Sequence, residues 1–142
     1  MMFTPSRDEA RRFLAETWNK FRAGQPLSAL ERIAATIIAE HPEYHALLDD
    51  PERHLERDFQ PEGGSMNPFL HLSLHLAVAE QLAIDQPTGI RAEFERLRAA
   101  RGDEHAALHA VVECLGETLW QAQRARTGPD ASVYLECLAR QR

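Results

Sequence analysis

The chain has 142 residues and a mass of 16.1 kDa, with 44% apolar and 27% charged residues. This composition is typical of a globular domain and excludes a disordered or fibrous chain. The 16 Lys and Arg residues against 22 Asp and Glu residues give a net charge of −6, which disfavours a nucleic-acid-binding protein. The length predicts a single domain over residues 1–142.

Two features bear on the cellular compartment. The first residues show no basic start followed by an apolar run, and the longest apolar stretch, Phe69 to Ala79, is too short and too polar to cross a bilayer. We therefore expect a cytoplasmic protein without a membrane segment. The only cysteines, Cys114 and Cys137, are too few for a disulfide framework, and we expect both to be reduced residues of the core.

Apolar residues recur at helical spacing along nearly the whole chain, and no strand pattern is present. Capping residues and prolines indicate where the helices begin and end. A capping box at Ser28–Glu31 begins the second helix, and Pro42 ends it near His41. The predicted helices cover residues 6–24, 28–41, 43–48, 51–58, 68–85, 90–101 and 104–126, followed by a last short helix after Asp130.

Short connections favour antiparallel neighbours, so the pattern predicts an all-α, single-domain helix bundle. About four main helices form it, with short helices at residues 43–58 and at the C-terminus. The helix that begins at residue 68 is apolar almost all round, which is typical of a buried, central helix. Residues 59–66 are the one clear loop. Four aromatic side chains are expected in the core: Trp18, Phe94, Trp120 and Tyr134.

Histidine placement is the feature that points to function. Random placement of seven histidines would give about 0.3 pairs with His-x-x-x-His spacing. Six of the seven histidines form three such pairs: His41/His45, His71/His75 and His105/His109. Residues four apart lie on one face of a helix, and two imidazoles at this spacing can chelate one metal ion.

The order of the predicted helices brings all three pairs near one end of the bundle. With a rise of about 1.5 Å per residue, His71 lies about 6 Å above its helix cap, and His105 and His109 lie about 3 and 9 Å above theirs. The heights of these histidines along their helices overlap, so their side chains can converge on one site. Each pair also lies in or just before the first turns of a helix, where the helix dipole disfavours imidazolium and favours the neutral, metal-binding form.

We therefore predict a helical metalloprotein that binds one or two transition-metal ions. The candidate ligands are His71, His75, His105, His109, His41, His45 and Glu113. Imidazole and carboxylate ligands without thiolate suit iron, zinc or manganese. No motif for an organic cofactor, a phosphate or a catalytic nucleophile is present.

The same residues have structural interpretations. Glu113 on a long helix is more often solvated, and Glu80 is a weaker ligand candidate because it lies about 180° around the helix from His71. His54 has no partner at this spacing and is interpreted as a surface residue. The alternative function is a non-enzymatic interaction or regulatory module with structural histidines, which binds a protein partner or a second copy of the chain. The two hypotheses differ in whether imidazole nitrogens from different helices converge.

Four segments, HPEYH, NPFLHLSLHLAVAEQ, DQPTGI and HAALHAVVECLGETLWQAQR, resemble a bacterial family, the domain of unknown function numbered eighteen-forty-one. The resemblance covers nearly the whole chain, from Phe3 to about Leu138. It implies a small bacterial cytoplasmic protein and no particular chemistry. The middle helix is also loosely similar to hemerythrin-like bundles, which hold two irons, although the order of the ligands here departs from that pattern.

Overall fold

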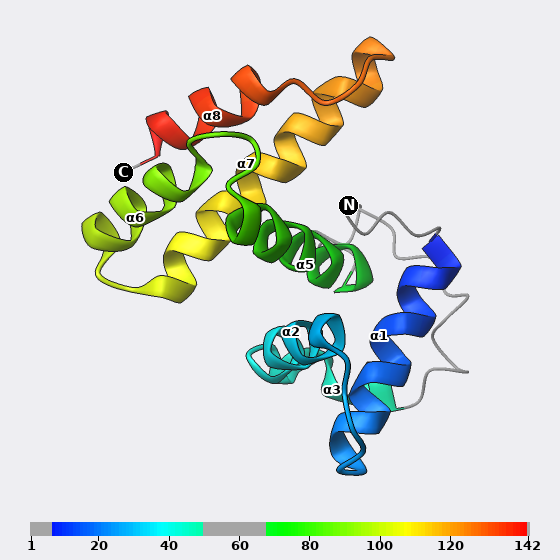
Figure 1. Ribbon diagram of the computed structural model, residues 1–142. Coiled ribbons are helices and arrows are strands. Elements are labelled where there is room, and N and C mark those ends of the chain that lie inside the picture. Colours follow the sequence, from blue (N-terminus) through cyan, green and yellow to red (C-terminus); the bar gives the residue numbers. More distant parts are fainter. Residues whose placement is uncertain (1–6, 50–67, 142) are drawn as a thin grey trace. The chain divides into compact units, whose positions relative to one another are not determined.

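The structure is a computed structural model that describes residues 7–49 and 68–141. Within these ranges the chain forms helices and no strand, which confirms the predicted all-α fold (Figure 1). The chain divides into two compact units, Met1–Leu76 and Ala77–Arg142, and each is described by itself. That the whole chain is one domain stays a prediction. The predicted helix at 51–58, the loop at 59–66 and His54 lie outside the described residues.

The first unit contains α1 (Arg7–Arg22), α2 (Ala29–Ala39), the 3₁₀ turn η1 (Pro42–Tyr44), α3 (His45–Asp49) and the first half of α5 (Pro68–Ile84). Helix α1 packs against both α2 and α3. The predicted capping box begins α2, because the Ser28 hydroxyl accepts from the Glu31 N–H at 3.1 Å and the Glu31 carboxylate accepts from the Ser28 N–H at 2.8 Å.

Apolar residues on α1, α2, α3 and α5 form the core of this unit. Trp18 is buried there, and its indole N–H donates to the Asp49 carboxylate at 3.0 Å, which ties α1 to the end of α3. A buried indole needs such an acceptor. The buried members of the core are Leu14, Ala15, Trp18, Ala34, Ile38, Leu48, Phe69, Leu72 and Leu76.

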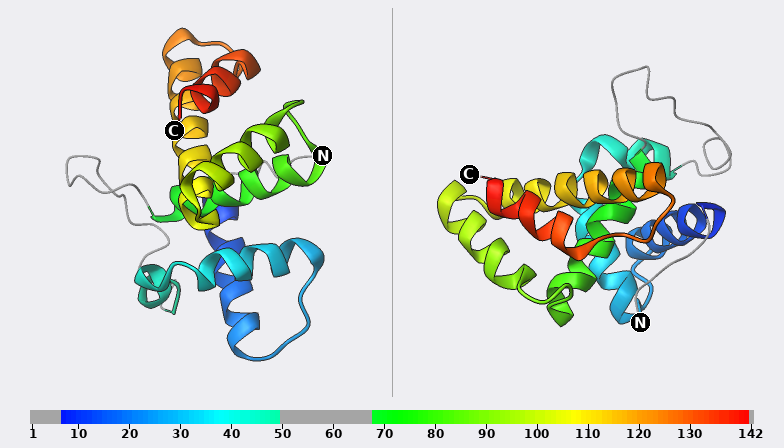
Figure 2. Two further views of the ribbon diagram at one scale, coloured as in Figure 1. Left: turned by 90° about the vertical axis from the view of Figure 1, so that its left-hand side faces the viewer. Right: turned by 90° about the horizontal axis from the view of Figure 1, so that it is seen from above.

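The second unit contains the second half of α5 with α6 (Ile90–Arg101), α7 (Glu104–Ala125) and α8 (Ala131–Arg140). Helices α6, α7 and α8 lie side by side, each in contact with the other two (Figure 2). Phe94 and Tyr134 are buried, as predicted, and the Tyr134 hydroxyl donates to the Gln81 side-chain carbonyl at 2.7 Å. This bond joins α8 to α5 within the unit.

Trp120 corrects the predicted core. Its side chain is 51% exposed, and the Arg124 guanidinium lies 4.7 Å from the centre of its ring. The two residues are four apart on α7, so the cation covers the indole face from the same helix. Helical periodicity in the sequence places Trp120 on α7 correctly. It does not show whether another helix covers the face of α7 that carries Trp120.

The turn between α5 and α6 is built by side chains that bond to its backbone. The Asp85 carboxylate accepts from the backbone N–H groups of Gly89 and Arg91, at 3.3 and 3.0 Å. The Arg91 guanidinium donates to two carbonyls at the end of α5, those of Leu82 at 2.7 Å and Ala83 at 2.5 Å. Gly89 has φ 101°, a conformation that side chains rarely tolerate. The DQPTGI segment therefore ends one helix and begins the next.

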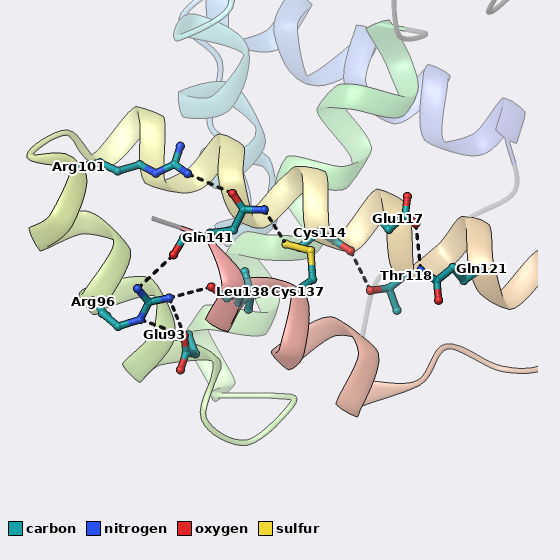
Figure 3. Close-up of a disulfide and its surroundings, with 10 residues drawn as sticks. All are labelled: Glu93, Arg96, Arg101, Cys114, Glu117, Thr118, Gln121, Cys137, Leu138 and Gln141. Carbon is teal, nitrogen blue, oxygen red and sulfur yellow. Dashed lines mark hydrogen bonds and ion pairs between the residues drawn. A yellow bond between two sulfur atoms is a disulfide. The ribbon is translucent and has the colours of Figure 1, made fainter.

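The prediction of two reduced cysteines is wrong. Cys114 on α7 and Cys137 on α8 form a disulfide with an S–S distance of 2.11 Å and Cα atoms 5.7 Å apart (Figure 3). The residues are 23 apart in sequence, and only the reversal of the chain between α7 and α8 brings them together.

Among the helices that the structure describes, none is long and apolar enough to cross a membrane.

The Tyr134 hydroxyl gives the second unit a testable response to alkaline pH. Burial raises the pKa of Tyr134 above its usual value, so the folded state favours the neutral phenol. The resulting stability is complete below the unfolded pKa of about 10 and is lost as the pH rises above it. We expect the free energy of unfolding in urea to fall more steeply between about pH 9.5 and 11 in the wild type than in Tyr134→Phe. Equal slopes for the two proteins would contradict this assignment.

Candidate metal centre

The site begins at the end of α2, where Pro42 interrupts the helix. In a continuing helix the N–H of residue 42 would bond to the Ile38 carbonyl, but proline has no N–H. That carbonyl instead accepts from the backbone N–H of His41 at 2.9 Å and from Nε2 of His45 at 2.8 Å. His45 therefore supplies a donor in place of the one that Pro42 lacks.

The same helix end orients His41. Its Nδ1 lies 2.8 Å from the Ile37 carbonyl, and a ring nitrogen at this distance from a carbonyl must carry the proton. In the neutral ring the lone pair is then on Nε2. This is the arrangement typical of a metal-ligating histidine, in which one nitrogen donates to a carbonyl and the other faces the metal. His41 is 1% exposed, so its ring is held within the protein.

His71 and His75 come from the first two turns of α5, four residues apart on one face. Their Nε2 atoms lie 3.2 Å apart, and their rings meet at an interplanar angle of 70°. Two imidazoles that bind one tetrahedral zinc, each at about 2.05 Å, have nitrogens about 3.3 Å apart. The observed separation therefore fits two ligands of one ion.

The ring of His41 lies against both of these side chains. Its centroid is 5.1 Å from that of His71 and 4.7 Å from that of His75, and both contacts are close to perpendicular. The ligating nitrogens of these three histidines all lie within 4.8 Å of one another. Imidazoles from the end of α2 and from α5 thus converge, which is the observation that separates the metal hypothesis from the alternative of independently bonded structural histidines.

Tyr44 forms one wall of the His41, His71 and His75 cluster, and sequence analysis did not single it out. Its ring stacks on His41 with centroids 5.7 Å apart and an interplanar angle of 2°, and it meets the edge of His71 at 6.0 Å. Burial raises the pKa of Tyr44, and the nearby charge of Glu43 adds to the effect. Tyr44 follows His41 by one turn of a 3₁₀ helix, which is the only signal that the sequence offers.

The structure does not bring every predicted ligand into this cluster. His45 uses Nε2 for the Ile38 carbonyl, and its ring lies 4.3 Å from that of Trp18. In the second unit, His105 and His109 are half-buried, with their ring centroids 4.2 Å apart, so they share one face of α7 as predicted. Glu113 is exposed on the same helix.

The chain matches the family described as a domain of unknown function, DUF1841, over residues 6–140 and belongs to that family. This agrees with the resemblance seen in its motifs. No curated protein matches the chain. No solved structure matches it, so the similarity to hemerythrin-like bundles stays an expectation.

Replacement of His45 separates its structural role from metal binding. We expect His45→Ala to lower the free energy of unfolding by about 0.5–1.5 kcal/mol, because the Ile38 carbonyl loses one of its two donors. His45→Gln should recover part of the loss, since its amide N–H can donate to the same carbonyl. Urea unfolding monitored by circular dichroism measures both changes. Equal stability of His45→Ala and the wild type would show that this bond contributes nothing.

Proposed function

We propose that this protein binds one transition-metal ion through neutral imidazoles. The ligands within the first unit are His41, His71 and His75. The observation that supports this most strongly is the 3.2 Å separation of the His71 and His75 Nε2 atoms beside a His41 ring whose Nδ1 proton is held by a carbonyl. The sequence separately predicts His109 as a ligand, from its pair spacing and its place in the first turns of α7.

The chemistry of the donors selects among metals. Imidazole nitrogens suit zinc, iron, copper and nickel, whereas manganese prefers carboxylate and water oxygens. Glu113, the carboxylate that would have favoured manganese, is exposed on α7. We therefore propose zinc or ferrous iron as the bound ion.

The proposed role of the ion is structural. A metal site of this kind rarely exists in the unfolded chain, so the free energy of binding contributes to folding. His41 follows the end of α2, whereas His71 and His75 belong to α5, so the ion would link two elements separated by η1, α3 and residues 50–67. Because it binds the folded state, the ion stabilises that state by mass action.

Metal analysis of the untagged protein tests the proposal. We expect one equivalent of zinc or iron after purification, or uptake of one equivalent of zinc by the metal-free protein in calorimetry. His71→Ala and His75→Ala should each weaken zinc binding by about 100-fold or more, because each removes a direct ligand. The matched control is His45→Gln, which changes a histidine of the same unit that already donates to a carbonyl.

The outcomes are distinct. Absence of metal together with absence of uptake would contradict the proposal and favour the interaction module with structural histidines. Loss of binding in His45→Gln equal to that in His71→Ala would also contradict it. His109→Ala tests the sequence-based prediction separately: zinc affinity equal to the wild type would contradict that prediction, and a loss similar to that of His75→Ala would support it.

We also propose the bacterial cytoplasm as the compartment, following the expectation from the sequence. The disulfide makes this proposal testable, because cytosolic disulfides in most organisms are transient, catalytic or redox-sensing. Cell fractionation followed by immediate thiol alkylation would locate the protein and give the oxidised fraction of Cys114 and Cys137. Recovery of the protein only from a secreted fraction would contradict the proposal.

A further inference from the structure

The two cysteines of the disulfide differ in burial. Cys114 is completely buried on α7, at 0% exposed, whereas Cys137 on α8 is only partly buried. A thiolate opens a disulfide by attack on one sulfur while the other leaves. Access therefore directs an incoming thiol to Cys137 and makes Cys114 the leaving group.

Polar groups around Cys114 favour this direction. The side-chain amide Nε2 of Gln141 lies 3.7 Å from the Cys114 sulfur, and the carbonyl oxygen of the same amide accepts from the Arg101 guanidinium at 3.1 Å (Figure 3). Arg101 thus orients the Gln141 amide so that its N–H points to the sulfur. An N–H donor and a nearby cation stabilise a thiolate at Cys114 more than the neutral disulfide.

Helix α8 has other attachments that do not depend on the disulfide. Leu138 is completely buried, and the Arg96 guanidinium donates to the carbonyls of Leu138 at 2.7 Å and Gln141 at 3.3 Å. The Tyr134 hydroxyl bonds to Gln81 at the other end of the helix. These contacts can hold α8 in place in the dithiol form, so the pair can change oxidation state without unfolding.

From these observations we propose that Cys114–Cys137 is a reversible redox pair, opened by low-molecular-weight thiols at the Cys137 sulfur. The incoming thiolate forms a new S–S bond with Cys137, the Cys114–Cys137 bond breaks, and Cys114 leaves as a thiolate beside Gln141 and takes up a proton. A second thiolate then attacks the sulfur of the first thiol and releases Cys137. Two thiols become one small disulfide, and their two electrons reduce the protein disulfide to two thiols.

Single-cysteine variants test the direction of attack. Folded Cys114→Ser protein, which keeps Cys137, should form a mixed disulfide with glutathione disulfide about tenfold faster or more than Cys137→Ser protein, which keeps the buried Cys114. Both should react equally fast in urea, where burial is removed. Equal rates in the folded state, or faster reaction of Cys114, would overturn the proposal.

The wild-type protein tests reversibility. We expect glutathione to reduce the disulfide under native conditions, with the adduct trapped by acid on the Cys137 peptide and the helical circular dichroism signal retained. Reduction that occurs only with loss of helical signal would overturn the proposal, because the disulfide would then be purely structural.

The Gln141 amide is tested with a matched pair of substitutions. Gln141→Leu removes the N–H donor beside Cys114, whereas Gln121→Leu removes an exposed glutamine of α7 that bonds only to Glu117 among the contacts described. The first should slow opening of the disulfide by glutathione about threefold or more, and the second should leave the rate unchanged. An equal rate in the wild type and Gln141→Leu would overturn the assigned role of Gln141.

Discussion

Pro42 is the constraint from which the histidine cluster follows. Because Pro42 cannot donate a backbone N–H, the helix does not continue through it: α2 ends at Ala39, and its last carbonyls accept from imidazole rings. His41 and His45 both serve this end, but with different nitrogens. His41 bonds to the Ile37 carbonyl through Nδ1, whereas His45 bonds to the Ile38 carbonyl through Nε2. The backbone N–H that Pro42 lacks thus leads His41 and His45 to bond through different ring nitrogens.

Helix α5 serves a different purpose in each of its halves. The first half contributes Phe69, Leu72 and Leu76 to the core of the first unit and carries His71 and His75 on one face. The second half carries Gln81, which accepts the buried Tyr134 hydroxyl in the second unit. Because the helix is apolar nearly all round, it can supply core residues to both units and still present a pair of imidazoles.

The proposed metal site and the disulfide involve different parts of the chain. The imidazoles of the first unit come from segments that are not consecutive, so a bound ion would join them. The disulfide joins two consecutive helices that already share buried side chains and the hydrogen bonds of Arg96. Its loss therefore removes a constraint on the unfolded chain more than a contact of the folded one.

The sequence by itself determined the features that depend on local geometry. Helical periodicity, the capping box at Ser28, the end of α2 at Pro42 and the His71/His75 pair all involve residues within four positions of one another, where helix geometry alone sets the distance. Tertiary structure decided the rest. It placed His41 beside α5, joined Cys114 to Cys137 and left Trp120 exposed, because each of these depends on which distant segment packs against a given face.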